Sequence, residues 1–206
     1  FEKIAGSCPY KSPTDMGVNM AGNCIVDDEA CQEAARQEII RRYYTALCDR
    51  RRGLGDDGII FKLELLMKQA GAAPEQRPVI ARANAVAEET GNPAAAIQLP
   101  DGRVVTGKTT DLLGAASTAI INALKELAGI DHSYHLISPE AIAPIQRVKV
   151  SHLGSCNPCL HSDETLIALA ITASSDPMTA KVLDQLDALR GCEAHSSVML
   201  SQVDRS

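Results

Sequence analysis

Residues 95–108 read AAIQLPDGRVVTGK, and the next residues, TTDLLGAA, open a segment with apolar side chains at helical spacing. Pro100, Asp101 and Gly102 are typical turn residues, and they separate two short runs suited to strands. This pattern predicts a β-hairpin that leads directly into a helix over about residues 109–128. The hairpin and the helix together predict an α/β core for this part of the chain.

The same stretch contains a literal match, at residues 102–109, to the phosphate-binding pattern G-x-x-x-x-G-K-[ST]. A working phosphate loop stays irregular between its strand and its helix, because several backbone N–H groups must curl around the phosphates. Here the middle residues Val104, Val105 and Thr106 are β-branched, and they continue the second strand of the hairpin. We therefore interpret the match as accidental.

Even without a phosphate loop, Lys108, Thr109 and Thr110 are expected at the N-terminus of the following helix. Free backbone N–H groups and a nearby cation at such a position favour an anion. The sequence therefore predicts that these residues bind a phosphorylated or carboxylated small molecule. The alternative is that they only begin the helix.

The composition limits the classes of protein to which the chain can belong. It has 206 residues and carries 20 Lys and Arg against 26 Asp and Glu, so its net charge is −6, which argues against nucleic acid or an anionic membrane as the main partner. No apolar run reaches the length of a membrane span. The seven cysteines are scattered, a usage that fits thiols in a reducing cytosol better than a disulfide framework. We therefore expect a cytoplasmic protein.

The pattern of apolar residues divides the chain into two parts. In residues 1–73 an extended segment precedes two helices, over about 27–50 and 57–70, which predict a helical hairpin subdomain. Residues 74–206 contain the β-hairpin, several helices and a final strand at 192–201. For this second part we predict an α/β subdomain with a small mixed sheet. Because the chain begins with Phe rather than Met, we expect a piece of a longer protein.

Seven segments spread over the chain carry a resemblance: YKSPTDMGVNMAG (10–22), QEIIRRYY (37–44), LPDGRVVTGKT (99–109), NALKELAGI (122–130), HLISPEAI (135–142), LHSDETLIAL (160–169) and LRGCEAHS (189–196). Together they resemble the carboxy-terminal part of a bacterial family catalogued as domain of unknown function 1846. The resemblance implies members about twice this length, without an established activity. It also implies a helical subdomain followed by an α/β/α layered subdomain, with a topology similar to that of the cytidine deaminases.

The implied topology makes a zinc site a candidate, because the cytidine deaminases bind zinc. Zinc deaminases open the helix after the hairpin with a His-x-Glu pair and a later helix with P-C-x-x-C. This chain has KTTD at 108–111 and CNPC at 156–159, so the deaminase ligands and the proton-shuttling Glu are missing. The remaining alternative is a structural zinc site with four ligands, Cys156, Cys159, Cys192 and His195. Residues 192 and 195 of the predicted final strand would point to opposite faces, which argues against this site. We expect no metal, and the sequence identifies no cofactor.

Polar residues before and after the later helices complete a candidate site. If their loops share one edge of the sheet with residues 108–110, they converge on a crevice. We predict that Asn157 binds the ligand, that His161 or His195 acts as general acid or base, and that Cys192 acts as nucleophile. The structural alternatives are a helix cap for the histidine and a small buried residue for the cysteine.

Two hypotheses about function follow, and whether the chain is an enzyme stays open between them. In the first, the chain is the C-terminal portion of a bacterial enzyme of unknown reaction that binds an anionic small molecule. In the second, it is a non-catalytic interaction or oligomerisation module that serves the upstream half of the same protein. The apolar faces of the N-terminal helix pair favour the second hypothesis and lead us to expect a homo-oligomer.

Overall fold

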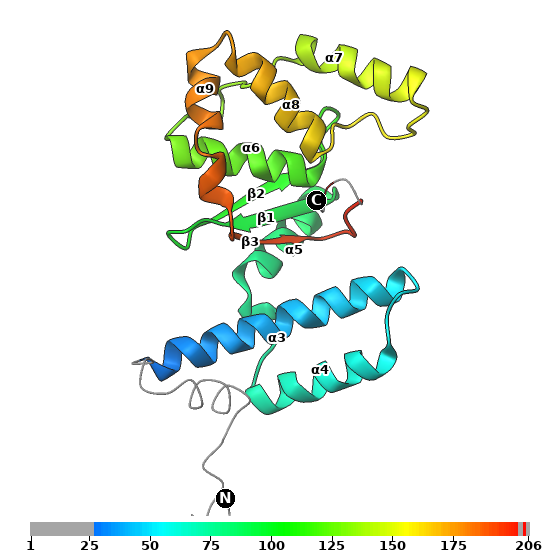
Figure 1. Ribbon diagram of the computed structural model, residues 1–206, viewed down its shortest axis with the longest axis vertical. Helices are drawn as coiled ribbons and strands as arrows, with labels where there is room; N and C mark the ends of the chain where they lie inside the picture. The colour runs from blue at the N-terminus through cyan, green and yellow to red at the C-terminus, as the bar shows by residue number, and fades with distance from the viewer. Residues whose placement is uncertain (1–26, 202–203, 205–206) are drawn as a thin grey trace, which may run out of the picture. The chain divides into compact units, whose positions relative to one another are not determined.

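The computed structural model describes residues 27–201 and Asp204, which form two compact units that divide between Arg77 and Pro78 (Figure 1). The extended segment expected over residues 1–26 lies outside the described residues. Within the described part, no helix is both long and apolar enough to cross a membrane.

The first unit contains the predicted helical hairpin, formed by α3 (Asp28–Arg51) and α4 (Asp57–Ala70). Both helices begin at aspartates whose side chains accept backbone N–H groups, as Asp27 does from Ala30 at 2.9 Å. Gly71, with a φ of 62°, ends α4 in the left-handed conformation that glycine adopts most easily. The short helix η1 (Pro74–Gln76) completes the unit.

The second unit is built on three strands in the order β2-β1-β3, namely β1 (Ala94–Gln98), β2 (Val104–Lys108) and β3 (Glu193–Ser196). Helices α5 (Pro78–Thr90) and α6 (Ala115–Ala128) cover its two faces, as Figure 1 shows. Alternate residues of β1 therefore face different helices, and all but Gln98 are buried.

The described strands pair only antiparallel, so the prediction of a mixed sheet is wrong. The parallel pairing that does occur is an isolated bridge between Leu113 and Leu160, which joins two loops and is too short to form a strand. The final strand is also shorter than predicted, because it ends at Ser196. The coarser prediction of an α/β fold is confirmed.

The remaining helices lie beyond α6 and are, in chain order, α7 (Pro139–Arg147), the π-helical turn η2 (Val148–His152), α8 (Ser162–Ala173), α9 (Pro177–Leu183) and η3 (Leu186–Leu189). Helices α8 and α9 pack against the side of α6 that faces away from the sheet. The core between them is aliphatic and includes Leu124, Ile142, Leu160, Leu169 and Val182.

Helix α6 begins at Ala115, so the prediction of a helix from residue 109 is wrong at its start. The hydroxyl of Thr110 accepts the N–H groups of Leu112 at 3.2 Å and Leu113 at 3.0 Å. A threonine that binds the backbone in this way stabilises a turn instead of a helix. Residues 109–114 are therefore a loop between β2 and α6.

The glycine of the GK pair is explained by packing. A Cβ atom on Gly107 would lie 2.2 Å from the backbone nitrogen of Ala119, so α6 approaches β2 more closely than any side chain would allow. The strand passes through the middle of the supposed phosphate loop, because β2 spans Val104–Lys108. Gly107 is therefore required by the contact between helix and strand.

We expect Gly107→Ala to lower the free energy of unfolding by about 1–3 kcal/mol, because the added methyl group overpacks a backbone contact. Lys108→Ala is the matched control, since Lys108 is exposed, and its effect should stay within about 0.5 kcal/mol. Urea unfolding of both variants measures the difference. Equal stability of the two variants would show that α6 does not pack on Gly107.

Candidate functional site

The loop before α6 and the loop before α8 are joined through the backbone of Leu160. Its N–H donates to the carbonyl of Leu112 at 2.9 Å, and its carbonyl accepts the N–H of Gly114 at 3.0 Å and the hydroxyl of Ser117 at 2.9 Å. Both Leu160 and Ser117 are fully buried. The residues on either side of Leu160 are thereby fixed against the start of α6.

Lys108, Thr109 and Thr110 do not lie at a helix N-terminus, because α6 begins at Ala115. Lys108 is the exposed last residue of β2, and the N–H of Thr109 donates to the carbonyl of Pro93 at 2.8 Å. The argument from free helical N–H groups therefore does not apply to these residues.

Two of the three predicted polar stretches do meet. The thiol of Cys159 donates to the carbonyl of Thr110 at 3.1 Å, which links the two loops a second time. Asn157 turns its side chain toward its own loop, since its Oδ1 accepts the N–H of Cys159 at 3.1 Å. The loop 155–161 thus lies beside the loop 109–114, with Asn157 holding its local shape.

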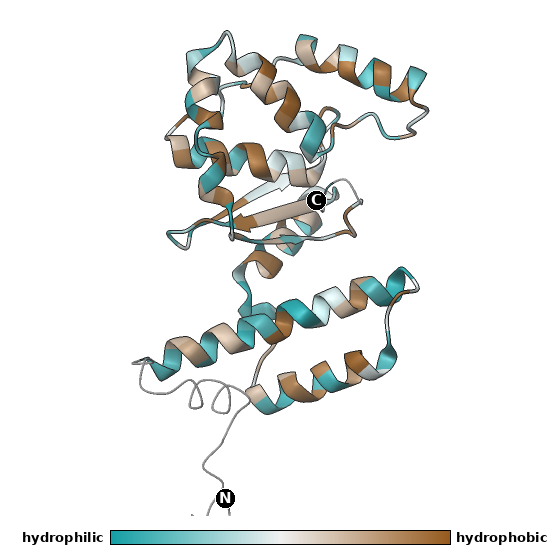
Figure 2. Cartoon of the chain, in the orientation of Figure 1, coloured by the Kyte–Doolittle hydropathy of each residue, from teal (hydrophilic) through white to brown (hydrophobic). Residues whose placement is uncertain are grey.

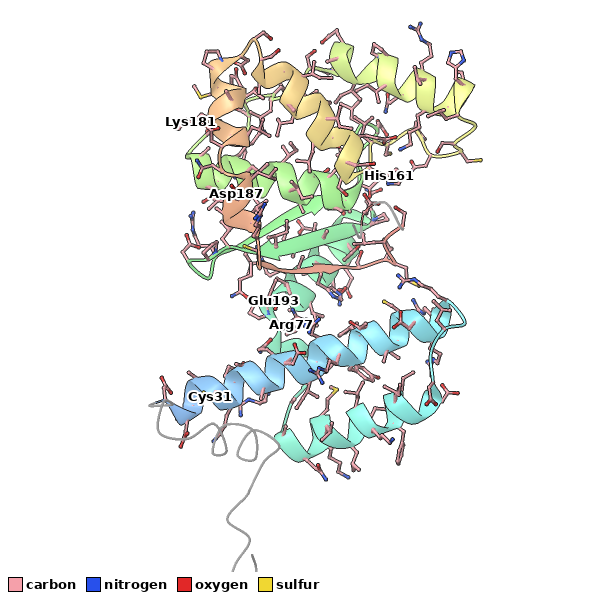
Figure 3. The ribbon with its side chains drawn as sticks, viewed as in Figure 1. Cys31, Arg77, His161, Lys181, Asp187 and Glu193 are labelled. Atoms are coloured by element: carbon pink, nitrogen blue, oxygen red, sulfur yellow. The ribbon has the colours of Figure 1, made fainter. Side chains whose placement is uncertain are left out.

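His161, labelled in Figure 3, occupies the N-cap position of α8. It is held by the carboxylate of Asp204. Its Nδ1 lies 2.8 Å from Oδ2 of Asp204. The other oxygen of Asp204 accepts the N–H and the hydroxyl of Ser162, at 3.0 and 2.7 Å, and Ser201 donates its hydroxyl to Oδ2 at 2.8 Å. This carboxylate therefore fixes both the imidazole and the first turn of α8.

These contacts also set the charge of Asp204. Burial by itself raises the pKa of this carboxyl, but hydrogen bonds from Ser162, Ser201 and His161 outweigh burial and lower the pKa from 3.8 to about 2. At neutral pH the group is ionised and can only accept hydrogen bonds. Nδ1 of His161 must then carry the proton, which leaves Nε2 of the neutral ring as an acceptor.

A buried ion pair supports the backbone of the same loop. Nζ of Lys149 donates to Oε2 of Glu164 at 2.7 Å and to the carbonyl of Cys159 at 2.6 Å, and its side chain is only 6% exposed. The same Oε2 accepts the N–H of His161 at 2.8 Å. Lys149 belongs to the π-helical turn η2, which directs it inward while Val148 and Val150 stay exposed.

Sequence reasoning missed Asp204, Lys149 and Glu164. A local signal existed for Glu164, because it follows the capping residue His161 by three positions, the spacing of a capping box. No local signal connected Asp204 to the candidate site, because its partners there, His161 and Ser162, precede it by more than forty residues. The same holds for Lys149, which a charge pattern alone does not separate from surface lysines.

Cys192 and His195 belong to a different part of the unit. Cys192 packs beside the apolar cluster under α6, and its thiol donates to the carbonyl of Ala188 at 3.5 Å. Burial raises its pKa above 9.0, whereas an activated thiolate needs a lowered one. His195 pairs with Ala96 across β1 and β3, whereas Cys192 precedes β3.

The four residues of the zinc alternative lie in two places, Cys156 and Cys159 in the loop before α8 and Cys192 and His195 at β3. Within residues 27–201 and Asp204, no three His, Cys, Asp or Glu side chains are grouped so that they could hold a metal ion. Cys156 is exposed and Cys159 binds Thr110, while Cys192 precedes β3 and His195 belongs to it.

The family of the chain can now be stated. Residues 75–206 match the family model described as domain of unknown function DUF1846, C-terminal, and residues 1–71 match the corresponding N-terminal domain. The chain belongs to the DUF1846 family. The predicted resemblance is confirmed at the level of the family, but its restriction to the C-terminal part is too narrow, since both domain models match.

Relatives of this DUF1846 chain carry names that state no activity. The UPF0371 protein of Corynebacterium glutamicum (strain R) is 56% identical over 204 residues, which cover 99% of this chain and 41% of the relative. The UPF0371 protein CE2832 of Corynebacterium efficiens is 55% identical with the same coverage, and a UPF0371 protein of Streptococcus thermophilus is 51% identical over 100% of this chain and 42% of its own length. The chain thus spans about two fifths of these relatives.

We expect the contact between Asp204 and α8 to survive from neutral pH to about 4 and to be lost as the pH falls toward 2. The folded state lowers the pKa of Asp204 from 3.8 to about 2, so the stabilisation is present above about 3.8 and disappears on acidification. The NMR signal of the Ser162 amide reports the change. A transition centred above pH 4 in the DUF1846 chain, or one that persists in Asp204→Asn, would contradict this assignment.

We expect Lys149→Met to lower the free energy of unfolding by about 2–4 kcal/mol, because it leaves the Glu164 carboxylate partly buried without its cation. The double variant with Glu164→Gln removes the orphaned charge and should recover part of the loss. Urea unfolding measures both. If the single variant is as stable as the double one, the ion pair does not hold the loop.

Proposed function

We propose that this DUF1846 chain is part of an enzyme in which His161 transfers protons to or from a small-molecule substrate. The observation that carries the proposal is the 2.8 Å contact between Nδ1 of His161 and Asp204. A histidine oriented by an anionic carboxylate recurs wherever an imidazole serves as general base and then as general acid. Asp204 acts here as a positioning residue, because it touches the imidazole and not the reacting atoms.

The surroundings of His161 support this role. Within the described part of the chain, no hydrogen bond engages its Nε2, and 21% of its side chain is exposed. Part of the imidazole is therefore open to solvent. The serine hydroxyls on Asp204 and the ion pair beneath the loop limit how far the ring can move.

The hydrogen bonds at the start of α8 also bear on the charge of the ligand. The N–H groups of His161 and Ser162 are already bound by Glu164 and Asp204, so the start of α8 offers little to an incoming anion. Lys108 retains an exposed charge but has no helix N-terminus beside it. We therefore propose that the substrate exchanges a proton with His161, and that it is not selected for a negative charge.

Two further assignments are also proposals. The first is a topology like that of the cytidine deaminases, which is supported by the order of α5, the antiparallel hairpin β1–β2, and α6. Such a likeness would be one of fold and not of activity. A cytoplasmic location is supported by the cysteines in the described residues, all of which are free thiols.

The proposal predicts that the full-length protein converts at least one compound in a bacterial metabolite extract. His161→Gln should lower the rate about 10²-fold or more, because the proton-transfer group is lost. His135→Gln is the matched control, since His135 is exposed on a loop of the same unit, and it should retain full activity. Mass spectrometry of the extract before and after incubation measures the conversion.

Two results would contradict the enzyme proposal. One is an activity that His161→Gln leaves unchanged. The other is that the full-length protein converts nothing, which would favour the second candidate function, a non-catalytic interaction module. The exposed apolar side chains of α4 support this second candidate. If the module joins copies of the same protein, sedimentation would detect a homo-oligomer.

A further inference from the structure

Helix α4 carries exposed apolar side chains outside its buried face. Residues 59–67 read IIFKLELLM, in which only Lys62 and Glu64 are polar. The helix hairpin buries Ile60, Leu63 and Met67. The remaining apolar side chains face outward, and Phe61 is 67% exposed, Ile59 50% and Leu65 48%. Figure 2 shows the resulting hydrophobic bands along α4.

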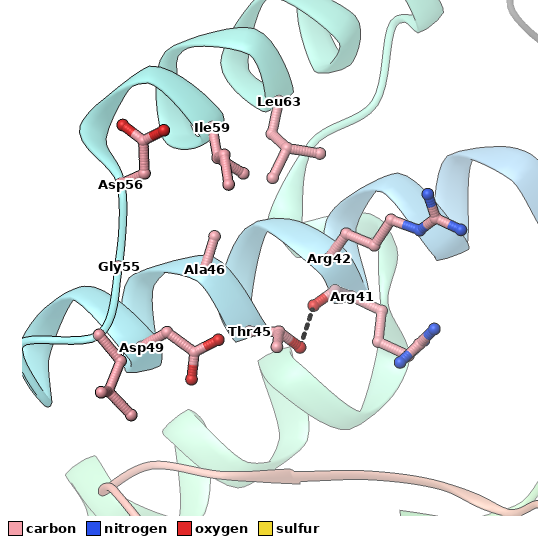
Figure 4. Close-up of a pocket in the computed structure, with 10 residues that line it drawn as sticks. Arg41, Arg42, Thr45, Ala46, Asp49, Gly55, Asp56, Ile59 and Leu63 are labelled. Atoms are coloured by element: carbon pink, nitrogen blue, oxygen red, sulfur yellow. Dashed lines mark hydrogen bonds between the residues drawn. The ribbon is translucent and has the colours of Figure 1, made fainter.

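A groove runs along one side of the helix pair (Figure 4). It encloses about 400 Å³, with Ala46 of α3 and Ile59 and Leu63 of α4 among its lining residues. Leu54, in the connection between the helices, also lines it and is 80% exposed. On the α3 side the lining is mostly polar and includes Arg41, Thr45 and Asp49, so the groove borders the apolar side chains of α4 with charged ones.

Helix α3 provides the contrast. Its outward side chains form ion pairs spaced three or four residues apart, including Glu33 with Arg36 at 2.9 Å and Glu38 with Arg41 and Arg42 at 2.7 Å. Such pairs are typical of a helix surface in water. Large apolar side chains left exposed beside charged ones, as on α4, are instead typical of a surface that further protein covers.

We infer that α4 is an interior helix of the complete N-terminal DUF1846 domain, and that the part of this domain outside the present chain covers its Phe61 and Leu65 face and the groove. The N-terminal domain match ends at residue 71, directly after α4, while the chain spans 41% of the relative from Corynebacterium glutamicum. Two helices alone bury too few side chains for an independent core.

The chemistry of the covering segment can be stated. Phe61, Leu65 and Lys68 share one face of α4, since they lie four and three residues apart. Lys62 is exposed and borders the same face. The covering segment should therefore be apolar at its centre, with acidic side chains at its rim. This inference is independent of the acid-base proposal, because it involves no residue of the second unit.

The test compares Phe61→Asp in two proteins. In the full-length protein, of the length of its relatives, the variant should lower the Tm by about 5 °C or more, because a carboxylate is forced into an apolar interface. In the present chain alone it should leave the Tm within about 1 °C, because Phe61 is exposed there. Asn84→Asp, at an exposed position of α5, adds the same charge and should alter neither protein.

A full-length protein whose Tm is unchanged by Phe61→Asp would overturn the inference. So would a dimer of the present chain, seen by sedimentation, that Phe61→Asp converts to a monomer, because the occupant would then be a second copy. Hydroxyl-radical footprinting of the unmodified full-length protein gives an independent measurement. Phe61 and Leu65 should be protected from oxidation, and rapid oxidation of both would contradict the inference even where a variant fails to fold.

Discussion

The second unit depends on one backbone pairing, between Leu160 and the residues that precede and open α6. The N–H and the carbonyl of Leu160 would be costly to bury unpaired, and both are satisfied by Leu112, Gly114 and Ser117. With its polar atoms bound, the side chain of Leu160 can join the core between α6 and α8. One face of α6 is fixed against the sheet at Gly107, so this pairing on its other side determines where α8 begins. His161, the next residue, is positioned as a consequence.

Charged side chains also help to fix the start of α8. The first turn of α8 attracts carboxylates, because its N–H groups and the helix dipole favour negative charge, and Asp204 and Glu164 both bind there. Lys149 compensates Glu164, whereas Asp204 is held by hydroxyl groups and by the imidazole. Asp204 thus connects the end of the described chain to the start of α8 and orients a histidine at the same time. The proposed site consists of a helix cap and a histidine, proposed here as the proton-transfer group, that share one carboxylate.

Sequence predicted the parts of the fold that local chemistry decides. The helices predicted over about 27–50 and 57–70 match α3 and α4 nearly to the residue, and in the structure aspartate caps and the terminating Gly71 set these ends. The hairpin was equally visible, because Pro100-Asp101-Gly102 separates two short strands. The start of α6 was not visible in the sequence, because the apolar residues at 109–114 have helical spacing. In the structure, the turn at Thr110 and the bridge to the distant Leu160 keep these residues in a loop. For the candidate site, the sequence predicted His161 and Asn157, a call that stays a prediction, but it did not indicate Asp204, since no local pattern encodes a contact across 43 residues.

The account rests on the claim that Asp204 fixes the tautomer and the orientation of His161. Long-range ¹H–¹⁵N NMR spectra of the histidine side chains measure this directly, at a pH where the imidazole is neutral. The account predicts that His161 carries its proton on Nδ1, with Nε2 unprotonated, and that Asp204→Asn weakens this preference. A neutral His161 protonated on Nε2 in the unmodified protein would contradict the account, because Nδ1 could then not donate to the carboxylate.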